Sequence, residues 1–118
     1  MNTKRIVPNI AAENLDTADA FYGKLLGLDL LMDLGWIRTY GSPGKMSPQI
    51  SIATEGGSGT PVPDISIEVD DLDVILEKVK RANYPIEYGP VAEPWGVKRF
   101  YLRDPYGKLI NILQHEQA

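Results

Sequence analysis

The sequence predicts an α+β fold made of two modules of order βαβββ, which form curved mixed sheets around a cavity. One helix is expected to pack on the outer face of each module. Two observations predict this fold. The same order of strands and helices occurs twice along the 118 residues, and Asn14–Asp16 and Asp71–Asp73 hold the same place between strand and helix in the two copies. A sheet with an apolar face needs a helix or a second sheet to cover it.

The two modules are expected to form one domain of 118 residues. Module one covers about residues 5–54 and module two about residues 64–115. Between them, residues 55–63 are rich in Gly, Ser, Thr and Pro, a composition that is typical of a flexible linker.

Module one begins with a strand over residues 6–12, which contains Pro8 and is therefore expected near a sheet edge. Asp16 or Thr17 is the predicted N-cap of the helix that follows, and Gly27 the residue that ends it. Alternating apolar residues then predict three more strands, over residues 28–34, 36–40 and 49–54.

Module two begins with a strand over residues 65–69, followed by a helix with Asp71 as its predicted N-cap. A strand over residues 86–91 precedes a hairpin whose two strands alternate apolar and polar side chains. The hairpin turn is Asp104–Gly107, in which Asp can accept turn amides, Pro presets φ and Gly allows positive φ.

Composition excludes several classes of function. The chain has no cysteine, so disulfides, thiolate nucleophiles and Cys-ligated metal centres are excluded. Its net charge of −4 and the lack of a basic stripe argue against nucleic-acid binding. No apolar run is long enough to cross a bilayer, and the first residues lack the apolar region of a signal peptide, so we expect no membrane partner and a cytoplasmic location.

Strand alternation predicts which side chains face the cavity. In module two, Ile65 and Phe100 represent the apolar positions that are expected to pack on the helix, and in module one Ile37 and Ile52 do so. The remaining positions give a mixed aromatic and polar lining, which suits a small polar or zwitterionic ligand. With Trp95 at the cavity mouth, the predicted ligand-binding residues are Asn9, Trp36, Arg38, Gln49, Ser66, Glu68, Trp95, Arg99, Tyr101 and Asn111.

A purely structural role for these residues is also open. Trp36 and Trp95 are equally compatible with a core or interface role, and Arg38 with simple exposure to solvent. Arg99 with Glu68 is expected to be either part of the site or a partly buried ion pair.

Several motifs resemble the glyoxalase/bleomycin-resistance/dioxygenase group, the vicinal oxygen chelate superfamily. In the first half these are Asn14–Asp16, Ala20–Tyr22 and Leu25–Leu28, and in the second half Ile67–Asp73 and the hairpin turn Asp104–Gly107. In addition, Pro94–Phe100 is similar to the corresponding run of bleomycin-resistance proteins. The resemblance to the superfamily implies the two-module fold. The similarity of Pro94–Phe100 to bleomycin-resistance proteins implies a protein that binds its ligand without a metal and without catalysing a reaction on it.

The resemblance also implies where a metal would bind. Metal-dependent members hold a divalent ion with His, Gln or Glu on the first strand of each module and just after the hairpin turn. Those positions here are Val7, Asp64 and Asn111, and Val7 cannot ligate an ion. A hard cation on Asp64, Glu68 and Asn111 is the weak alternative, because such ions prefer oxygen. We therefore expect no cofactor, with a divalent metal ion as the alternative.

The single histidine, His115, follows the predicted last strand and is interpreted as a solvated residue of the tail rather than a ligand or base. With no other histidine and no cysteine, a hydrolase triad is not expected.

Three functions stay open from the sequence. The first is a metal-independent small-molecule binding protein, with sequestration of a drug or toxin as one form of this function. The second is a divalent-metal-dependent lyase, isomerase or dioxygenase, with Glu68 and Tyr101 as weak catalytic candidates. The third is an accessory domain with an unused cavity. Whether the chain is an enzyme is therefore undecided, and we expect a homodimer, since the resemblance implies cavities at a subunit contact.

Overall fold

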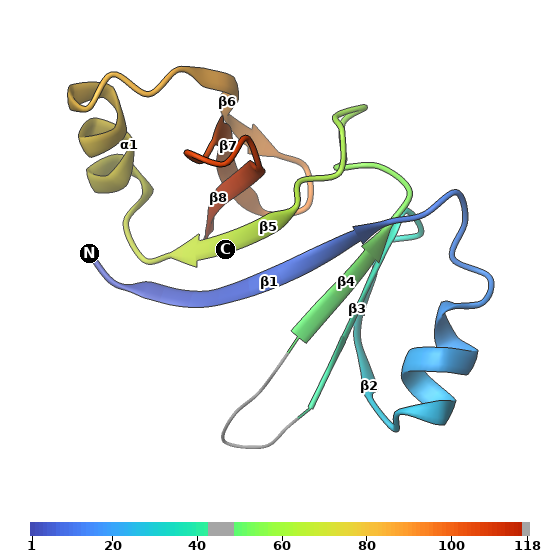
Figure 1. The fold of residues 1–118 in the computed structure, drawn as a ribbon. Coiled ribbons are helices and arrows are strands. Elements are labelled where there is room, and N and C mark those ends of the chain that lie inside the picture. The colour runs from blue at the N-terminus through green and yellow to red at the C-terminus, as the bar shows by residue number, and fades with distance from the viewer. Residues whose placement is uncertain (43–48, 117–118) are drawn as a thin grey trace. The chain divides into compact units, whose positions relative to one another are not determined.

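The computed structural model describes residues 1–42 and 49–116. The chain divides into two compact units (Figure 1). Unit 1 consists of residues Met1–Ile6 and Pro63–Ala118, and unit 2 of residues Val7–Val62. Strand β1 (Thr3–Ala11) begins in unit 1 and ends in unit 2. Among the described residues, no helix combines the length and the apolar character needed to cross a membrane.

Unit 2 follows the predicted βαβββ order. After β1 come helix η1 (Asp19–Leu25) and strands β2 (Asp29–Asp33), β3 (Ile37–Gly41) and β4 (Gln49–Ala53). The strand order is β2-β3-β4-β1, with β4 parallel to β1 and the other neighbours antiparallel. The buried core of this unit is formed by Leu15, Ala18, Tyr40 and Ile52.

The first helix differs from its prediction. It is a short π-helix whose N-cap position is Ala18, where no side chain caps the helix, so neither Asp16 nor Thr17 is the cap. The reason lies in the preceding turn. Asn14 Oδ1 accepts from the Asp16 backbone N–H at 3.1 Å, and Ala18 already has helical dihedral angles, so the chain does not enter the helix from an extended cap residue.

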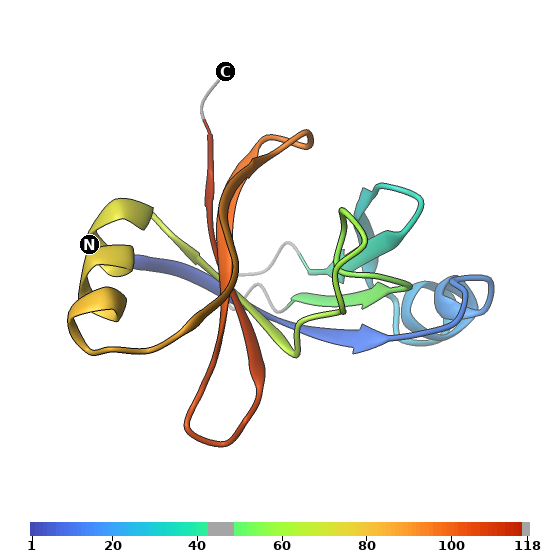
Figure 2. The same cartoon turned by 90° about the horizontal axis from the view of Figure 1, so that it is seen from above.

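Unit 1 repeats the order with β5 (Ile65–Val69), α1 (Leu72–Arg81), β6 (Ile86–Glu93), β7 (Val97–Arg103) and β8 (Leu109–His115). The strand order is β1-β5-β8-β7-β6, and β5 and β8 are parallel. Figures 1 and 2 show α1 on one side of the sheet that β5, β8 and β7 form.

Helix α1 begins as predicted at Asp71, whose Oδ1 accepts from the Val74 backbone N–H at 3.3 Å. Its apolar stripe packs on the sheet, as the hydrophobic spacing predicts. The buried cluster between helix and sheet consists of Val69, Leu72, Leu76, Val79, Phe100, Ile110 and Ile112. The helix-facing strand positions of module two are therefore confirmed.

The turn between β7 and β8 is also confirmed. Asp104 Oδ1 accepts from the backbone N–H groups of Tyr106 and Lys108, both at 2.9 Å, and Gly107 has φ of +79°. These bonds set the register of the hairpin, in which Tyr101 lies opposite Asn111.

The segment between the modules folds into a closed turn, which its composition alone does not predict. Gly56 N–H donates to the Thr60 carbonyl at 2.8 Å, and Gly59 N–H donates to Glu55 Oε1 at 3.0 Å.

Candidate functional site

The face of the unit 1 sheet opposite α1 carries the polar side chains that alternation predicts for it. We call this the polar face. Ser66, Asn111 and Tyr101 form one row across β5, β8 and β7, while Glu68 and Arg99 lie in the next row on either side of Leu113. The sequence therefore predicts correctly that these five polar residues share a face.

A buried cluster of charged and aromatic side chains forms part of the polar face. The Arg99 guanidinium donates from Nη2 to Glu93 Oε2 and from Nη1 to Tyr101 Oη, both at 2.8 Å. Tyr88 Oη donates to Glu93 Oε1 at 2.9 Å. Arg99 Cζ lies 4.9 Å from the ring centroids of Trp95 and Tyr101, and 5.4 Å from that of Tyr88. Cations are attracted to aromatic faces at such distances, so the guanidinium is held both by its bonds and by the rings.

Arg99 thus pairs with Glu93, so the alternative of an Arg99–Glu68 ion pair is wrong. The side chains of Arg99 and Glu93 are each 3% exposed. Sequence reasoning missed Glu93 because β6 runs two residues beyond the predicted strand of residues 86–91, and it missed Tyr88 because β6 departs from regular alternation. The β6–β7 register shifts between Ile86 and Tyr88 and again between Tyr88 and Val91, so a period of two cannot assign the faces of β6.

Glu68 has partners of its own. Arg5 Nε donates to Glu68 Oε1, and His115 Nδ1 lies 3.0 Å from Glu68 Oε2. Lys4 Nζ lies 3.6 Å from the same Oε2. Burial of the carboxyl opposes ionisation, but the hydrogen bonds and charges of Arg5 and His115 outweigh it and lower the pKa of Glu68. Glu68 is therefore a carboxylate at neutral pH.

The interpretation of His115 as a tail residue is wrong. Strand β8 includes His115 as its last residue and pairs it with Val97, whereas the prediction placed His115 after the strand. The pairing orients the imidazole toward Glu68 on the neighbouring strand. The sequence contained this signal, because Leu113 and His115 are two residues apart and so point to the same face of a strand.

Asn111 and Ser66 form a pair at the centre of the polar face. Asn111 Nδ2 donates to Ser66 Oγ at 3.1 Å. Asn111 is 7% exposed, and its buried Oδ1 accepts no hydrogen bond from the residues that the structure describes. A buried acceptor without a donor costs about 1–3 kcal/mol, so this oxygen favours a donor from outside the residues that the structure describes.

The weak metal set does not fit an ion. Asp64 Oδ2 accepts from the Leu109 backbone N–H at 2.8 Å, and both Glu68 oxygens face cations or His115. Asp64 and Glu68 stand roughly 13 Å apart along the chain at a rise of about 3.3 Å per residue. A shared ion needs its oxygen ligands within about 5 Å of one another. Across residues 1–42 and 49–116, no three His, Asp or Glu side chains gather in a group able to hold a metal.

Unit 2 places its candidate residues differently from the prediction. Asn9 pairs with Ser51 and so shares a face with it, on the side opposite the core residue Ile52. Gln49 lies two residues before Ser51 on β4, so its side chain is on the same face, and it pairs with Gly41. These two predictions of face agree with the register.

Arg38 lies on the other face, contrary to the prediction. It pairs with the core residue Ile52, and its Nη1 donates to the Leu15 carbonyl at 3.2 Å. Tyr40 fills the core position on β3 that the prediction gave to Ile37, and a shift of one residue exchanges the two faces of a strand. Trp36 directly precedes β3, and its carbonyl accepts from the Thr54 backbone N–H at 2.9 Å.

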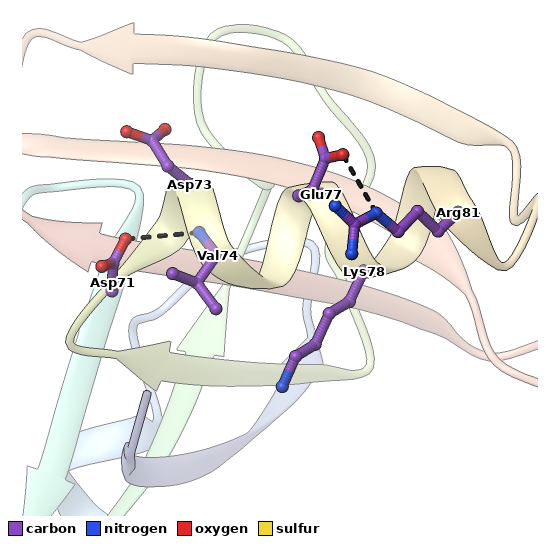
Figure 3. A pocket seen from close by; sticks show the side chains of 6 residues that line it. All are labelled: Asp71, Asp73, Val74, Glu77, Lys78 and Arg81. Carbon is purple, nitrogen blue, oxygen red and sulfur yellow. Dashed lines mark hydrogen bonds and ion pairs between the residues drawn. The ribbon is translucent and has the colours of Figure 1, made fainter.

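A shallow depression of about 420 Å³ lies along the solvent side of α1 (Figure 3). Its side chains are exposed and, apart from Val74, charged, as in the Glu77–Arg81 ion pair, and α1 separates it from the polar face. None of its residues is buried, so we place no site there. The residues are Asp71, Asp73, Val74, Glu77, Lys78 and Arg81.

Comparison with solved structures shows the same fold in proteins of low sequence identity. A protein of Legionella pneumophila described as an NAD-dependent benzaldehyde dehydrogenase is 15% identical, with a TM-score of 0.74 over 95% of this chain and 100% of that one. A methylmalonyl-CoA epimerase of Streptomyces coelicolor in complex with 2-nitronate-propionyl-CoA is 17% identical, with a TM-score of 0.70 over 99% and 100%.

A superfamily member from Vibrio splendidus 12B01 is 17% identical, with a TM-score of 0.63 over 96% of this chain and 99% of that one. Comparison with curated proteins found no match. The model of the Glyoxalase/Bleomycin resistance protein/Dioxygenase superfamily matches residues 5–112. The chain therefore belongs to the glyoxalase/bleomycin resistance protein/dioxygenase superfamily.

Proposed function

We propose that the chain is a small-molecule binding protein of this superfamily, which holds a polar or zwitterionic ligand on the polar face of unit 1 without a divalent metal ion. The observation that carries the proposal is Asn111 Oδ1, a buried acceptor that receives no hydrogen bond from the described residues. A ligand N–H or O–H group at this point would donate to the acceptor and so remove the free-energy cost of leaving it unsatisfied.

The neighbours of Asn111 support a ligand of mixed character. Tyr101 lies opposite Asn111 on β7, and its hydroxyl is held by the Arg99 guanidinium. Trp95 and Tyr88 add ring faces to the same cluster. Fixed hydrogen-bonding groups beside aromatic surface are typical of sites for small molecules, because the rings supply contact area and the polar groups fix orientation.

The engagement of the weak metal ligands supports binding without a metal. An ion at Glu68 would have to displace Arg5 from the carboxylate and lie beside Lys4, so it would compete with these two cations for one negative charge and be repelled by both. Asp64 would have to give up its bond to the Leu109 backbone, which joins the start of β5 to the start of β8.

The test is thermal unfolding in EDTA with free amino acids, aromatic carboxylates and amino sugars added one by one. A ligand that binds only the folded chain raises the unfolding midpoint by mass action. We expect at least one of these compounds to raise the midpoint of the natural chain, and Asn111→Leu to abolish that rise. Without ligand, Asn111→Leu should be as stable as the natural chain or more so, because an unsatisfied acceptor is replaced by an apolar group of similar size.

Ser66→Ala is the matched control. It removes the partner of Asn111 Nδ2 and keeps the acceptor, so the response to the ligand should remain. The proposal fails if no compound of the three classes shifts the midpoint, or if the shift survives in Asn111→Leu.

A further inference from the structure

Unit 2 has an uncovered apolar surface where η1 leads into β2 (Figure 1). Leu30 of β2 lies opposite Tyr40, whose ring centroid is 5.8 Å from that of Tyr22 in η1. Leu30 and η1 are therefore on the same side of the sheet. We call the exposed apolar side chains at this place the η1–β2 surface. Each of them is about half exposed or more, and they are Phe21, Leu25, Leu26 and Leu30.

The size of the η1–β2 surface fits a small protein interface. Four such side chains, each about half exposed, present roughly 300 Å² of apolar area, a size at which exposed patches are often functional. Because about 60% of an interface is apolar, two copies of this surface correspond to a contact of roughly 1,000 Å². An area of about 1,000 Å² is the lower limit for a specific interface between proteins. A second copy of the chain therefore supplies enough surface to be the partner.

Two opposite charges flank the apolar run Leu25–Leu28 within this surface. Lys24 comes directly before the run and Asp29 directly after it. Their side chains form no ion pair with the residues that the structure describes, whereas Asp33, at the other end of β2, lies 3.3 Å from Arg38 Nε. A surface that carries one cation and one anion is complementary to itself about a two-fold axis, because each cation can meet the anion of the other copy.

We propose that the η1–β2 surface docks a second copy of this chain about a two-fold axis. Residues 24–29 of one copy run antiparallel to the same residues of the other. Each Lys24 then forms an ion pair with the partner's Asp29, and the leucines between the two charges pack together. The contact uses none of the residues of the polar face, so it does not depend on a ligand there.

The alternative of pairing two β2 strands edge to edge is disfavoured. Strand β2 is the last strand of the sheet, so its outer edge could accept another strand. An antiparallel pair centred on Leu31 would place Asp29 opposite the partner's Asp33, and like charges directly opposite each other are destabilising. The register shift between Leu30 and Met32 also interrupts the regular ladder. The two copies therefore meet through side chains and do not extend the sheet.

Charge reversal tests this contact in the full chain. Light scattering over a range of concentrations should give the mass of two natural chains. Lys24→Glu places a carboxylate opposite the partner's Asp29 at two places in the dimer, and it should raise the dissociation constant of the dimer by about tenfold or more. Asp29→Lys should have the same effect. The double variant Lys24→Glu with Asp29→Lys restores both ion pairs in reversed order, so it should dimerise as the natural chain does.

Lys80→Glu is the matched control. Lys80 is an exposed residue of α1, in unit 1, and the substitution changes the charge by the same amount, so the dimer should be unaffected. Circular dichroism checks the folding of each variant, and both Lys24 and Asp29 are exposed. A natural chain with the mass of one chain at every concentration, or a Lys24→Glu variant that dimerises as the natural chain does, would overturn the proposal. A double variant that stays a monomer would also overturn it, because the two charges would then not meet.

A lipid surface is the other occupant that an exposed apolar patch could have. Flotation with phosphatidylcholine vesicles tests it. We expect the natural chain to stay unbound, since its own copy covers the leucines. A natural chain that floats with the vesicles as a monomer, and loses this binding in Leu25→Lys, would assign the η1–β2 surface to a membrane and overturn the proposal.

Discussion

The ion pair between Arg99 and Glu93 is expected to be among the most sensitive contacts of unit 1. Both side chains are 3% exposed, so neither charge can return to water if its partner is removed. We predict that Glu93→Gln lowers the free energy of unfolding by about 3–5 kcal/mol, the usual cost of leaving a buried charge without its partner. Urea denaturation measures this loss.

The control for Glu93→Gln lies on the same two strands. Arg103 Nε and Glu87 Oε1 are also 2.8 Å apart, but their side chains are 49% and 41% exposed. Glu87→Gln should therefore cost far less than Glu93→Gln, because water solvates whatever remains. Equal losses from the two variants would mean that burial does not decide the strength of the Arg99 pair.

Glu68 is predicted to make stability depend on pH in the acid range. Its folded pKa lies below the ordinary value of 4.5, so the folded state resists protonation of this group. The stabilisation is fully present above the ordinary pKa and is lost as the pH falls through the folded pKa.

The measurement is the free energy of unfolding of the natural chain and of Glu68→Gln between pH 7 and pH 3. The natural chain should be the more stable at pH 7, and the gap should narrow below about pH 4.5. A gap that stays constant over this range would show that Arg5 and His115 do not favour the ionised form of Glu68.

The two helices are capped differently, and this gives a prediction at the level of the element. Asp71 caps α1 through the Val74 N–H, whereas η1 has no side-chain cap. Asp71→Ala should lower the free energy of unfolding by about 1 kcal/mol, while Thr17→Ala should change it little. Chemical denaturation of the two variants decides it, and a comparable loss in Thr17→Ala would contradict the assignment.

The elements that sequence reasoning predicts well are those with a regular period and a local stop signal. Helix α1 has both, with Asp71 before it and Pro85 after it, and the β7–β8 hairpin is fixed by Asp104. The faces of β6 could not be predicted, because two register shifts break its alternation and hide Tyr88 and Glu93. Propensity and period are local, whereas a bulge depends on the neighbouring strand.

The same dependence on neighbouring strands explains why the ion pairs of the candidate site could not be predicted from the sequence. Alternation correctly brings Glu68, Arg99 and Asn111 to one face, yet it cannot say which charge pairs with which. Arg99 takes Glu93 and Glu68 takes Arg5, pairings that depend on the order of strands in the sheet. On β3, both Ile37 and Tyr40 could fill the core, and the choice of Tyr40 reversed the predicted side of Arg38.

At the scale of the whole molecule, we propose that the chain forms a homodimer. Unit 2 exposes several large apolar side chains at the end of η1 and on β2, namely Leu25 at 69%, the C-cap Leu26 at 54% and Leu30 at 48%. Exposed apolar side chains grouped in this way are typical of surfaces that another protein covers. Light scattering at micromolar concentration should give twice the mass of 13.1 kDa, and Leu25→Lys should shift the mass toward that of one chain. A single-chain mass for the natural protein would contradict the proposal.

The central claim is that this chain binds its ligand without a metal. Thermal unfolding of metal-stripped protein tests it, with Mg²⁺, Mn²⁺, Fe²⁺, Ni²⁺ and Zn²⁺ added in turn. Because an ion that binds only the folded state must raise the midpoint, we predict no rise with any of them. A rise that disappears in Asp64→Ala or Glu68→Ala, but persists in His115→Gln, would contradict the claim and identify the chain as a metal-binding member of the superfamily.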